Sequence, residues 1–331
     1  MIKIVATAID WQYRKPFRIS RATITHSYCV RVQVSDLDGH VGHSEAEGLD
    51  YAGETQESML AQIEAAAQQL NLTARAADVR QQLISILPLG GARNALDCAL
   101  WDLEAKASGI PVWRLTNTQN FNAVETAYTL GISEPDQLRQ AAKACGHYTL
   151  LKVKTNREQG LDPIRIVHQQ VPHARLIVDP NQAWSGDDLA RYRNELSDLN
   201  VVLLEQPLSV DEDAILTTMR LPVPVAADES FTDTASINCL IGKYQVLNIK
   251  LDKTGGLTEA LRAAQYGLSK GFKLMVGCSG GSSLAMAPGL ILAQGADFVD
   301  LDGPLLLGHD CEFGLIYSGS KLEVPSQLLW G

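Results

Sequence analysis

Arg175-Leu-Ile-Val-Asp-Pro-Asn181 is the first of three short apolar runs that end in a carboxylate; the others are Val201-Val-Leu-Leu-Glu-Gln-Pro207 and Val223-Pro-Val-Ala-Ala-Asp-Glu229. Their acids follow one another at intervals of 26 and 23 residues and are Asp179, Glu205 and Asp228. A buried apolar run that ends in a charge is typical of a parallel strand. Because the carboxyl ends of barrel strands meet at one end of the barrel, we predict that these acids hold Mg²⁺, which prefers such oxygen ligands.

Lysines flank this triad with the same period. Lys152 and Lys154 lie in Leu150-Leu-Lys-Val-Lys-Thr155, and Lys250 lies in Val246-Leu-Asn-Ile-Lys-Leu-Asp252. Residues two apart on a strand share one face, so Lys152 and Lys154 are predicted to point the same way. Each charge taken alone is more typical of a helix cap, a turn or a solvated strand end. Six charges in register across five successive strands indicate a functional site instead.

The second part of the chain repeats a strand and a helix every 22 to 26 residues, which predicts a (β/α)₇β barrel of the TIM type. The eight predicted strands are Thr126 to Gly131, Leu150 to Lys154, Leu176 to Asp179, Val201 to Glu205, Val225 to Asp228, Val246 to Leu251, Lys273 to Gly277 and Phe298 to Asp302. A doubly wound open sheet is the alternative, but no Gly-x-Gly-x-x-Gly follows a strand.

The first part of the chain has a different pattern. Residues 1 to about 48 are β-rich, with a turn at Asp36-Leu-Asp-Gly39, and residues from about 55 to 109 are helical. Strands followed by helices favour a separate α+β domain. We therefore predict an α/β protein in which residues 1–118 and 311–331 form an α+β capping domain and residues 119–310 form the barrel.

The bulk composition narrows the class of partner and the compartment. The net charge of −10 on 331 residues argues against unspecific binding to nucleic acid or to an anionic membrane. The six cysteines are scattered without a Cys-x-x-Cys motif, and the N-terminus lacks the pattern of a signal peptide. We expect a cytoplasmic protein without a membrane span.

The predicted site suits one reaction class, removal of the proton α to a carboxylate. A divalent metal stabilises the charge that develops on the enediolate oxygens. A base must be uncharged near pH 7, and burial together with neighbouring cations is expected to lower the pKa of Lys154. Lys152 is expected to bind the substrate carboxylate. Lys154 and Lys250 lie on the second and sixth strands, across the barrel mouth, which predicts a 1,1-proton transfer with inversion by an isomerase.

These motifs are similar to those of the enolase superfamily, in its muconate-lactonizing-enzyme subgroup. The resemblance covers essentially the whole chain and implies that Lys154 and Lys250 are the acid/base residues and that the triad binds Mg²⁺. Phe298-Val-Asp-Leu-Asp-Gly-Pro304 further resembles the dipeptide epimerases, which implies that Asp300 and Asp302 bind the α-ammonium of a dipeptide. Asn248-Ile-Lys-Leu-Asp-Lys-Thr-Gly-Gly-Leu257 resembles the alanyl-glutamate epimerases of murein-peptide recycling.

Two departures concern substrate choice. Ile24 stands where the alanyl-glutamate epimerases have an arginine that holds the glutamate side chain, and Arg18 or Arg21 is a candidate substitute. Ser279 lies in the small-residue segment Cys278-Ser-Gly-Gly-Ser282, which is expected to leave room for a bulkier N-terminal side chain. We expect weaker preference for glutamate.

Alternatives remain at this stage. Within the subgroup they are an N-acylamino-acid racemase, an o-succinylbenzoate synthase and a cycloisomerase, whose substrates lack the free ammonium that Asp300 and Asp302 would bind. A barrel that binds metal and ligand without turnover is the alternative outside enzymes, although paired lysine bases argue against it. The expected partner is a small dipeptide; assembly as a homo-oligomer is left open.

Overall fold

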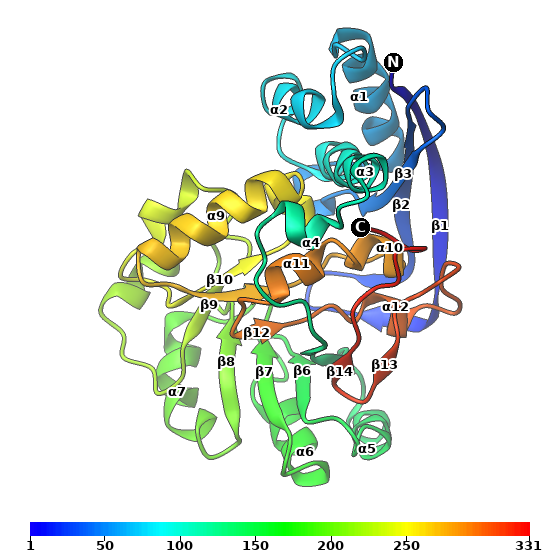
Figure 1. Ribbon diagram of the computed structural model, residues 1–331. Helices are drawn as coiled ribbons and strands as arrows, with labels where there is room; N and C mark the ends of the chain where they lie inside the picture. Colours follow the sequence, from blue (N-terminus) through cyan, green and yellow to red (C-terminus); the bar gives the residue numbers. More distant parts are fainter.

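The chain begins with a three-stranded antiparallel sheet in the order β1-β2-β3 (Figure 1). The computed structural model describes residues 1–331, and the three strands span Lys3–Arg18, Thr23–Ser35 and Val41–Glu47. Alternation along β2 buries Val30, Val32 and Val34 on one face, where they join an apolar core with the following helices. This sheet and the helices that cover it are called the capping region, residues 1–115.

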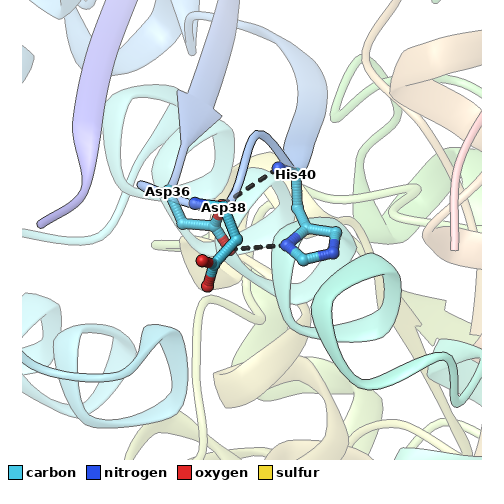
Figure 2. Close-up of side chains that lie close together, drawn as sticks. All are labelled: Asp36, Asp38 and His40. Atoms are coloured by element: carbon cyan, nitrogen blue, oxygen red, sulfur yellow. Dashed lines mark hydrogen bonds and ion pairs between the residues drawn. The ribbon is translucent and has the colours of Figure 1, made fainter.

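The turn between β2 and β3 is organised by one carboxylate (Figure 2). Asp36 Oδ1 accepts hydrogen bonds from the backbone N–H groups of Asp38 and His40, both at 2.9 Å, and Asp36 Oδ2 lies 2.8 Å from Nδ1 of His40. An aspartate that binds backbone groups a few residues ahead fixes a tight turn. The predicted turn at residues 36–39 is therefore confirmed.

Helices follow the sheet between residues 56 and 108, as predicted, and a short fourth helix that was not predicted comes after them. They are α1 Gln56–Gln69, α2 Ala76–Ile86, α3 Gly91–Ser108 and α4 Val112–Leu115. Thr55 and Ser58 form a reciprocal capping box at the start of α1. α3 is buried over most of its length because it packs on β2 and β3 and also contacts the barrel. It ends at Gly109, whose φ of 68° reverses the chain.

An eight-stranded parallel sheet in the order β12-β11-β10-β9-β8-β7-β6-β5 forms the second part of the molecule. Its strands are β5 Tyr128–Leu130, β6 Leu150–Lys154, β7 Arg175–Asp179, β8 Val201–Glu205, β9 Val225–Ala227, β10 Val246–Ile249, β11 Lys273–Val276 and β12 Phe298–Val299. The N–H of Ala127 donates to the carbonyl of Val299 at 2.8 Å, so the sheet curls until its edges meet. The predicted barrel-like α/β fold is confirmed.

Helices connect the strands on the outside of the barrel. The longer ones are α5 Pro135–Ala144, α6 Asp162–Gln170, α7 Gly186–Leu196 and α9 Leu257–Ser269; the one-turn helices are α8 Leu251–Thr254, α10 Ser283–Met286, α11 Gly289–Ala293 and α12 Gly303–Leu306. After β8 and β9 only the 3₁₀ turns Asp213–Thr217 and Ser236–Leu240 form. Hydroxyls there, such as that of Thr217 on the carbonyl of Ala214 at 2.8 Å, compete for backbone groups that a longer helix would use.

The barrel interior is filled in layers. Seven buried apolar side chains, one from each of seven neighbouring strand segments, form the layer at the amino-terminal end: Ala127, Leu150, Ile177, Leu203, Ala226, Val246 and Met275. Because successive inward residues on a strand are two apart, the next inward layer is set by the residues that follow these by two positions. The apolar layer therefore forms the floor beneath the next layer of inward side chains.

The C-terminal tail returns to β structure. β13 Tyr317–Ser318 and β14 Lys321–Leu322 form a small sheet with β4 Val124–Glu125, next to the barrel. The indole N–H of Trp330 donates to the carbonyl of Cys98 in α3 at 3.1 Å. The tail therefore touches both parts of the molecule, and the exact borders of the two domains stay a prediction. None of the helices has the length and apolar character needed to cross a membrane.

Candidate active site

The second inward layer of the barrel is polar. It follows the apolar layer by two positions on every strand and consists of Thr129, Lys152, Asp179, Glu205, Asp228, Asn248, Gly277 and, from the eighth strand, Asp300. The carboxylates of the predicted triad are no more than 2% exposed. Period-two alternation of inward residues therefore brings the three predicted acids and Lys152 to one level of the barrel, as the sequence indicated.

Lys152 lies in the middle of this layer. Its Nζ is 3.1 Å from Asp179, 2.8 Å from Glu205 and 2.8 Å from Asp300. Burial alone would lower the pKa of Lys152, but the attraction of Asp300, Glu205 and Asp179 outweighs it and raises the pKa well above its usual range. Lys152 is thus a fixed cation that offsets the charges around it.

The other two lysines lie one step closer to the barrel mouth. Lys154 Nζ is 2.5 Å from Asp179, and Lys250 Nζ is 2.7 Å from Asp228. Burial acts to lower the pKa of Lys250, but the nearby carboxylate of Asp228 raises it overall. Without substrate, the ammonium form of Lys250 is therefore favoured. Removal of a proton from the substrate requires the uncharged amine.

Glu205 has the least compensated charge of the triad. Burial first, and then the charge of Asp179, raise its pKa to about 8. Asn248 donates to Glu205 Oε1 at 2.9 Å, and Oε2 forms an ion pair with Lys152, whose Nζ lies 2.8 Å away. A side chain at Gly277 would collide with Asn248, since its Cβ would lie 2.6 Å from Asn248 Oδ1. The glycine therefore makes room for the amide that orients Glu205.

The residues present fit a Mg²⁺ site in their chemistry. Asp179, Glu205 and Asp228 are buried side by side and offer only hard carboxylate oxygens, the ligands that Mg²⁺ prefers. The triad does not bring three ligand atoms within 4.8 Å of one another, and each of its carboxylates contacts a lysine instead. Only Asp36, Asp38 and His40 place three ligand atoms within 4.8 Å of one another, and these belong to the hairpin turn (Figure 2).

Asp300 and Asp302 follow β12 and point to the same end of the barrel. Thr129 contacts both: its hydroxyl donates to Asp300 Oδ1 at 3.4 Å, and its N–H donates to Asp302 Oδ2 at 2.6 Å. Burial, with the charge of Asp300 second, raises the pKa of Asp302 to about 7. Asp300 is paired with Lys152, so Asp302 is the member of the pair that has no cation at ion-pair distance.

A cavity of about 370 Å³ covers these residues, and residues of the capping region form part of its lining. Eight predicted site residues line it: Ile24, Lys152, Lys154, Asp228, Lys250, Ser279, Asp300 and Asp302. Asp179 and Glu205 are not among its lining residues. Arg21 lines the cavity and Arg18 does not, which singles out Arg21 as the nearby arginine. Arg21 is already 3.3 Å from Glu229 and 3.5 Å from Asp50.

Some residues of the site escaped the sequence reasoning. Lys253 is 1% exposed, and its Nζ is 2.7 Å from Asp228 Oδ1 and 2.9 Å from the carbonyl of Asn248. Asn248 could have been found, because it precedes Lys250 by two positions as Lys152 precedes Lys154. Lys253 carries no such signal, because it lies on α8 and reaches back under the strand end. Glu47, from the capping region, also lines the cavity.

Comparison with known proteins agrees with this architecture. Residues 1–116 match the model of the mandelate racemase/muconate lactonizing enzyme N-terminal domain, and residues 135–306 match the model of the enolase C-terminal domain-like family. The chain is 43% identical to an N-acetyl-D-glutamate racemase of Pseudoalteromonas over 76% of this chain and 79% of that protein. It is 38% identical to the L-Ala-D/L-Glu epimerase of Escherichia coli (strain K12) over 95% and 97%, respectively.

Two solved structures are similar over nearly their full length. An enolase family member from Agrobacterium tumefaciens with homology to dipeptide epimerases, bound to sodium and L-Ala-L-Glu, has a TM-score of 0.94 and 39% identity and covers 100% of both chains. A dipeptide epimerase from Methylococcus capsulatus, complexed with Mg and L-Arg-D-Lys, has a TM-score of 0.90 and 28% identity and covers 98% of this chain and 97% of that one. The prediction of an isomerase of the racemase and epimerase type is confirmed. The chain belongs to the mandelate racemase/muconate lactonizing enzyme family of the enolase superfamily.

Proposed function

We propose that the chain is a Mg²⁺-dependent dipeptide epimerase that inverts the α-carbon of the C-terminal residue. One observation carries this proposal: Lys154 and Lys250 line a single cavity from β6 and from the end of β10, with Asp300 and Asp302 lining the same cavity. Two amines for one carbon and two carboxylates for one ammonium match a free dipeptide. The similarity to the Escherichia coli relative and to the two solved structures named above supports the same class.

Asp179, Glu205 and Asp228 would hold the Mg²⁺, which would supply positive charge to the substrate carboxylate as the α-proton leaves. Lys152 contributes a second fixed cation at the same level of the barrel, which favours binding of the carboxylate end of the substrate. The carboxylate-bearing residue is therefore the C-terminal one, and its α-carbon is the centre that inverts.

Lys154 and Lys250 exchange the proton on the two faces of that carbon. The pairing of Lys250 with Asp228 favours its ammonium form, which is the form that delivers a proton. In that direction Lys154 removes the proton from the opposite face, and the roles are exchanged for the other stereoisomer. The product is the epimer, with no net change in atoms or charge.

Asp300 and Asp302 bind the α-ammonium of the N-terminal residue, because charged groups in a buried site are stable when they are paired. Because the chain is similar to the L-Ala-D/L-Glu epimerase of E. coli, the first candidate substrate is the murein dipeptide L-Ala-D/L-Glu. Ile24 lines the cavity and supplies no cation for a glutamate side chain, and Arg21 is already paired with Glu229. We therefore keep the expectation of weaker preference for glutamate and greater tolerance of apolar side chains.

Racemisation of an N-acylated amino acid is the second candidate. It is favoured by the similarity to the N-acetyl-D-glutamate racemase of Pseudoalteromonas. The two candidates differ in one chemical feature, because an N-acyl group has no charge to place beside Asp300 and Asp302. Free dipeptides and N-acetyl amino acids therefore separate them.

The test is proton NMR in deuterated buffer with a panel of L-Xaa-L-Yaa dipeptides, N-acetyl dipeptides and N-acetyl amino acids, each with Mg²⁺ and with excess chelator. We expect uptake of deuterium at the C-terminal α-carbon of free dipeptides only when Mg²⁺ is present. Better turnover of an N-acetyl amino acid than of any free dipeptide would replace the first candidate by the second. Full activity with chelator would refute the role of the metal.

We also propose that residues 1–118 and 311–331 act as the capping domain and residues 119–310 as the barrel. The hydrogen bond of Trp330 to Cys98 and that of the Gly331 N–H to Asp102, at 2.8 Å, support the assignment of the tail. Truncation after residue 310 should lower the melting temperature, and an unchanged melting temperature would contradict the assignment.

A further inference from the structure

Glu47 is the last residue of β3 and projects into the cavity from the capping region. Its Oε1 accepts a hydrogen bond from the N–H of Tyr28 at 3.2 Å. Cys278 and Ser279, in the barrel segment after β11, line the same cavity. Glu47 is therefore a point at which the capping region presents a carboxylate to the substrate space.

Gly280 makes this placement possible. A Cβ at Gly280 would lie 2.2 Å from Glu47 Oε2, closer than any real contact. The small residues after β11 were expected to leave room for a bulky substrate side chain. That expectation stays a prediction, but the space directly at Gly280 is occupied by Glu47, which adds a charged group to the lining of the cavity.

No cation of the protein is paired with Glu47. Three other carboxylates near the cavity have one, in contrast to Glu47 and Asp302: Arg31 lies 2.9 Å from Glu45, and Arg21 contacts both Asp50 and Glu229. Burial is the main cause that raises the pKa of Glu47 to about 8; a hydrogen bond from the Ser27 hydroxyl acts to lower it, and the negative charges of Asp252 and Asp50 raise it further. Glu47 is half-buried and lines the cavity, so a cation in the cavity is the partner that its position allows.

Tyr13 lines the cavity together with Glu47 and Asp302. Burial first, then the charge of Glu47, and to a smaller extent that of Asp302, raise the pKa of its hydroxyl. The carbonyl of Gly281, next to the segment that Glu47 contacts, lies 3.2 Å from the position of a Cβ on Gly303, which follows Asp302. Glu47 is thus on the side of the cavity that the proposed function assigns to the N-terminal residue of the dipeptide.

Building on the proposed function, we propose that Glu47 is a specificity-determining residue that binds a positively charged nitrogen on the N-terminal residue of the substrate. Two nitrogens share this chemistry, the α-ammonium and the basic side chain of an N-terminal lysine or arginine. Asp300 and Asp302 already face the α-ammonium. A basic side chain would give Glu47 a counter-charge of its own.

The test compares kcat/KM of the wild-type enzyme and of Glu47→Gln for three substrates with the same C-terminal residue: L-Lys-L-Ala, L-Ala-L-Ala and N-acetyl-L-Ala-L-Ala. Glutamine keeps the size of the side chain and removes its charge. Glu64→Gln, a change of the same kind on an exposed face of α1, is the control. Binding of the basic side chain predicts a loss of about tenfold or more for L-Lys-L-Ala alone. Binding of the α-ammonium predicts a similar loss for both free dipeptides and none for the N-acetyl one.

A second variant reaches the same carboxylate from the barrel. Gly280→Ala should displace the Glu47 side chain and cause the same change in selectivity as Glu47→Gln. Gly295→Ala, where an added Cβ meets nothing within 4 Å, should not. Changes below about twofold in the ratios of kcat/KM for both Glu47→Gln and Gly280→Ala would overturn the role of Glu47. Failure of the proposed function itself gives a different result, because the wild-type enzyme would then epimerise none of the three substrates.

Discussion

Two groups of acidic residues in this molecule have similar chemistry and opposite surroundings. At the barrel mouth, Asp179, Glu205 and Asp228 are almost fully buried and held among lysines. In the β2–β3 turn, Asp36, Asp38 and His40 satisfy the spacing of a metal site more closely. The carboxylate of Asp36, however, is already hydrogen-bonded to Asp38 and His40 within the turn (Figure 2). Spacing alone is therefore a poor guide to function. Burial, and position at the carboxyl ends of parallel strands, distinguish a site from a turn.

The turn and the mouth also lie at opposite ends of the capping sheet. Residues from the start of β2 and Glu47 of β3 line the cavity, whereas the turn joins Ser35 to Val41 at the other ends of the same strands; the β2 residues are Thr23, Ile24, Thr25, His26 and Tyr28. Substitutions at the mouth should therefore change catalysis, and substitutions in the turn should change only stability. The following predictions test this distinction, beginning with the largest effect.

Loss of either proposed proton-transfer lysine should have the largest effect. Lys154→Ala and Lys250→Ala should each lower kcat for epimerisation by about a hundred- to ten-thousandfold, since positioned acid/base groups contribute on that order. Each variant keeps one amine, so exchange of the α-proton of one stereoisomer with deuterium should persist. NMR with L-L and L-D dipeptides measures both effects. Normal epimerisation by both variants would contradict the two-lysine mechanism.

Glu205→Gln should lower kcat by about a thousandfold, because a ligand of a charge-stabilising metal is worth several kcal/mol. Isothermal titration with Mg²⁺ in the absence of substrate gives an independent measurement, and weaker binding is expected. Asp36→Asn is the matched control from the turn and should leave both Mg²⁺ affinity at the mouth and kcat unchanged. A loss of activity in the control would erase the contrast between the two groups.

Asp300→Asn should raise KM for free dipeptides by about ten- to a hundredfold, because a charge-assisted hydrogen bond in a buried site is worth about 1.5–3 kcal/mol. The effect should be small for N-acetyl dipeptides, which have no ammonium to lose. Steady-state kinetics with both substrates check the prediction. Equal effects on the two would show that Asp300 acts through Lys152, its neighbour at 2.8 Å, and not through the substrate.

Asp36→Asn should have the smallest effect, a loss in the free energy of unfolding below about 1 kcal/mol near neutral pH. Slight desolvation acts to raise the pKa of Asp36, but hydrogen bonds from His40 outweigh it and lower the pKa from 3.8. A carboxylate whose pKa is lowered by folding stabilises the folded state at pH values above its pKa in the unfolded chain. This contribution is lost as the pH falls through its pKa in the folded protein. The difference between wild type and variant should therefore shrink in acid, as urea titrations at several pH values would show.

Much of this protein follows from its sequence. The runs around Asp179, Glu205 and Asp228, and the lysines that flank them, predicted a barrel because period-two burial and a repeat of strand and helix are properties of local sequence. The capping strands, the turn at Asp36 and the helix ending at Gly109 were predictable for the same reason. Membership in the family rested on these motifs, and the comparisons confirmed it.

Other features were decided by tertiary structure. Three of them depend on distances between segments far apart in the chain. They are the ion pairs between the triad and the lysines, the contact of Lys253 with Asp228, and the presence of Arg21 rather than Arg18 in the cavity lining. Glu47 and Gly280 are separated by more than two hundred residues, and neither is informative without the other. Such pairs arise when two surfaces pack, and close packing leaves room for a carboxylate only where the opposing chain has no side chain.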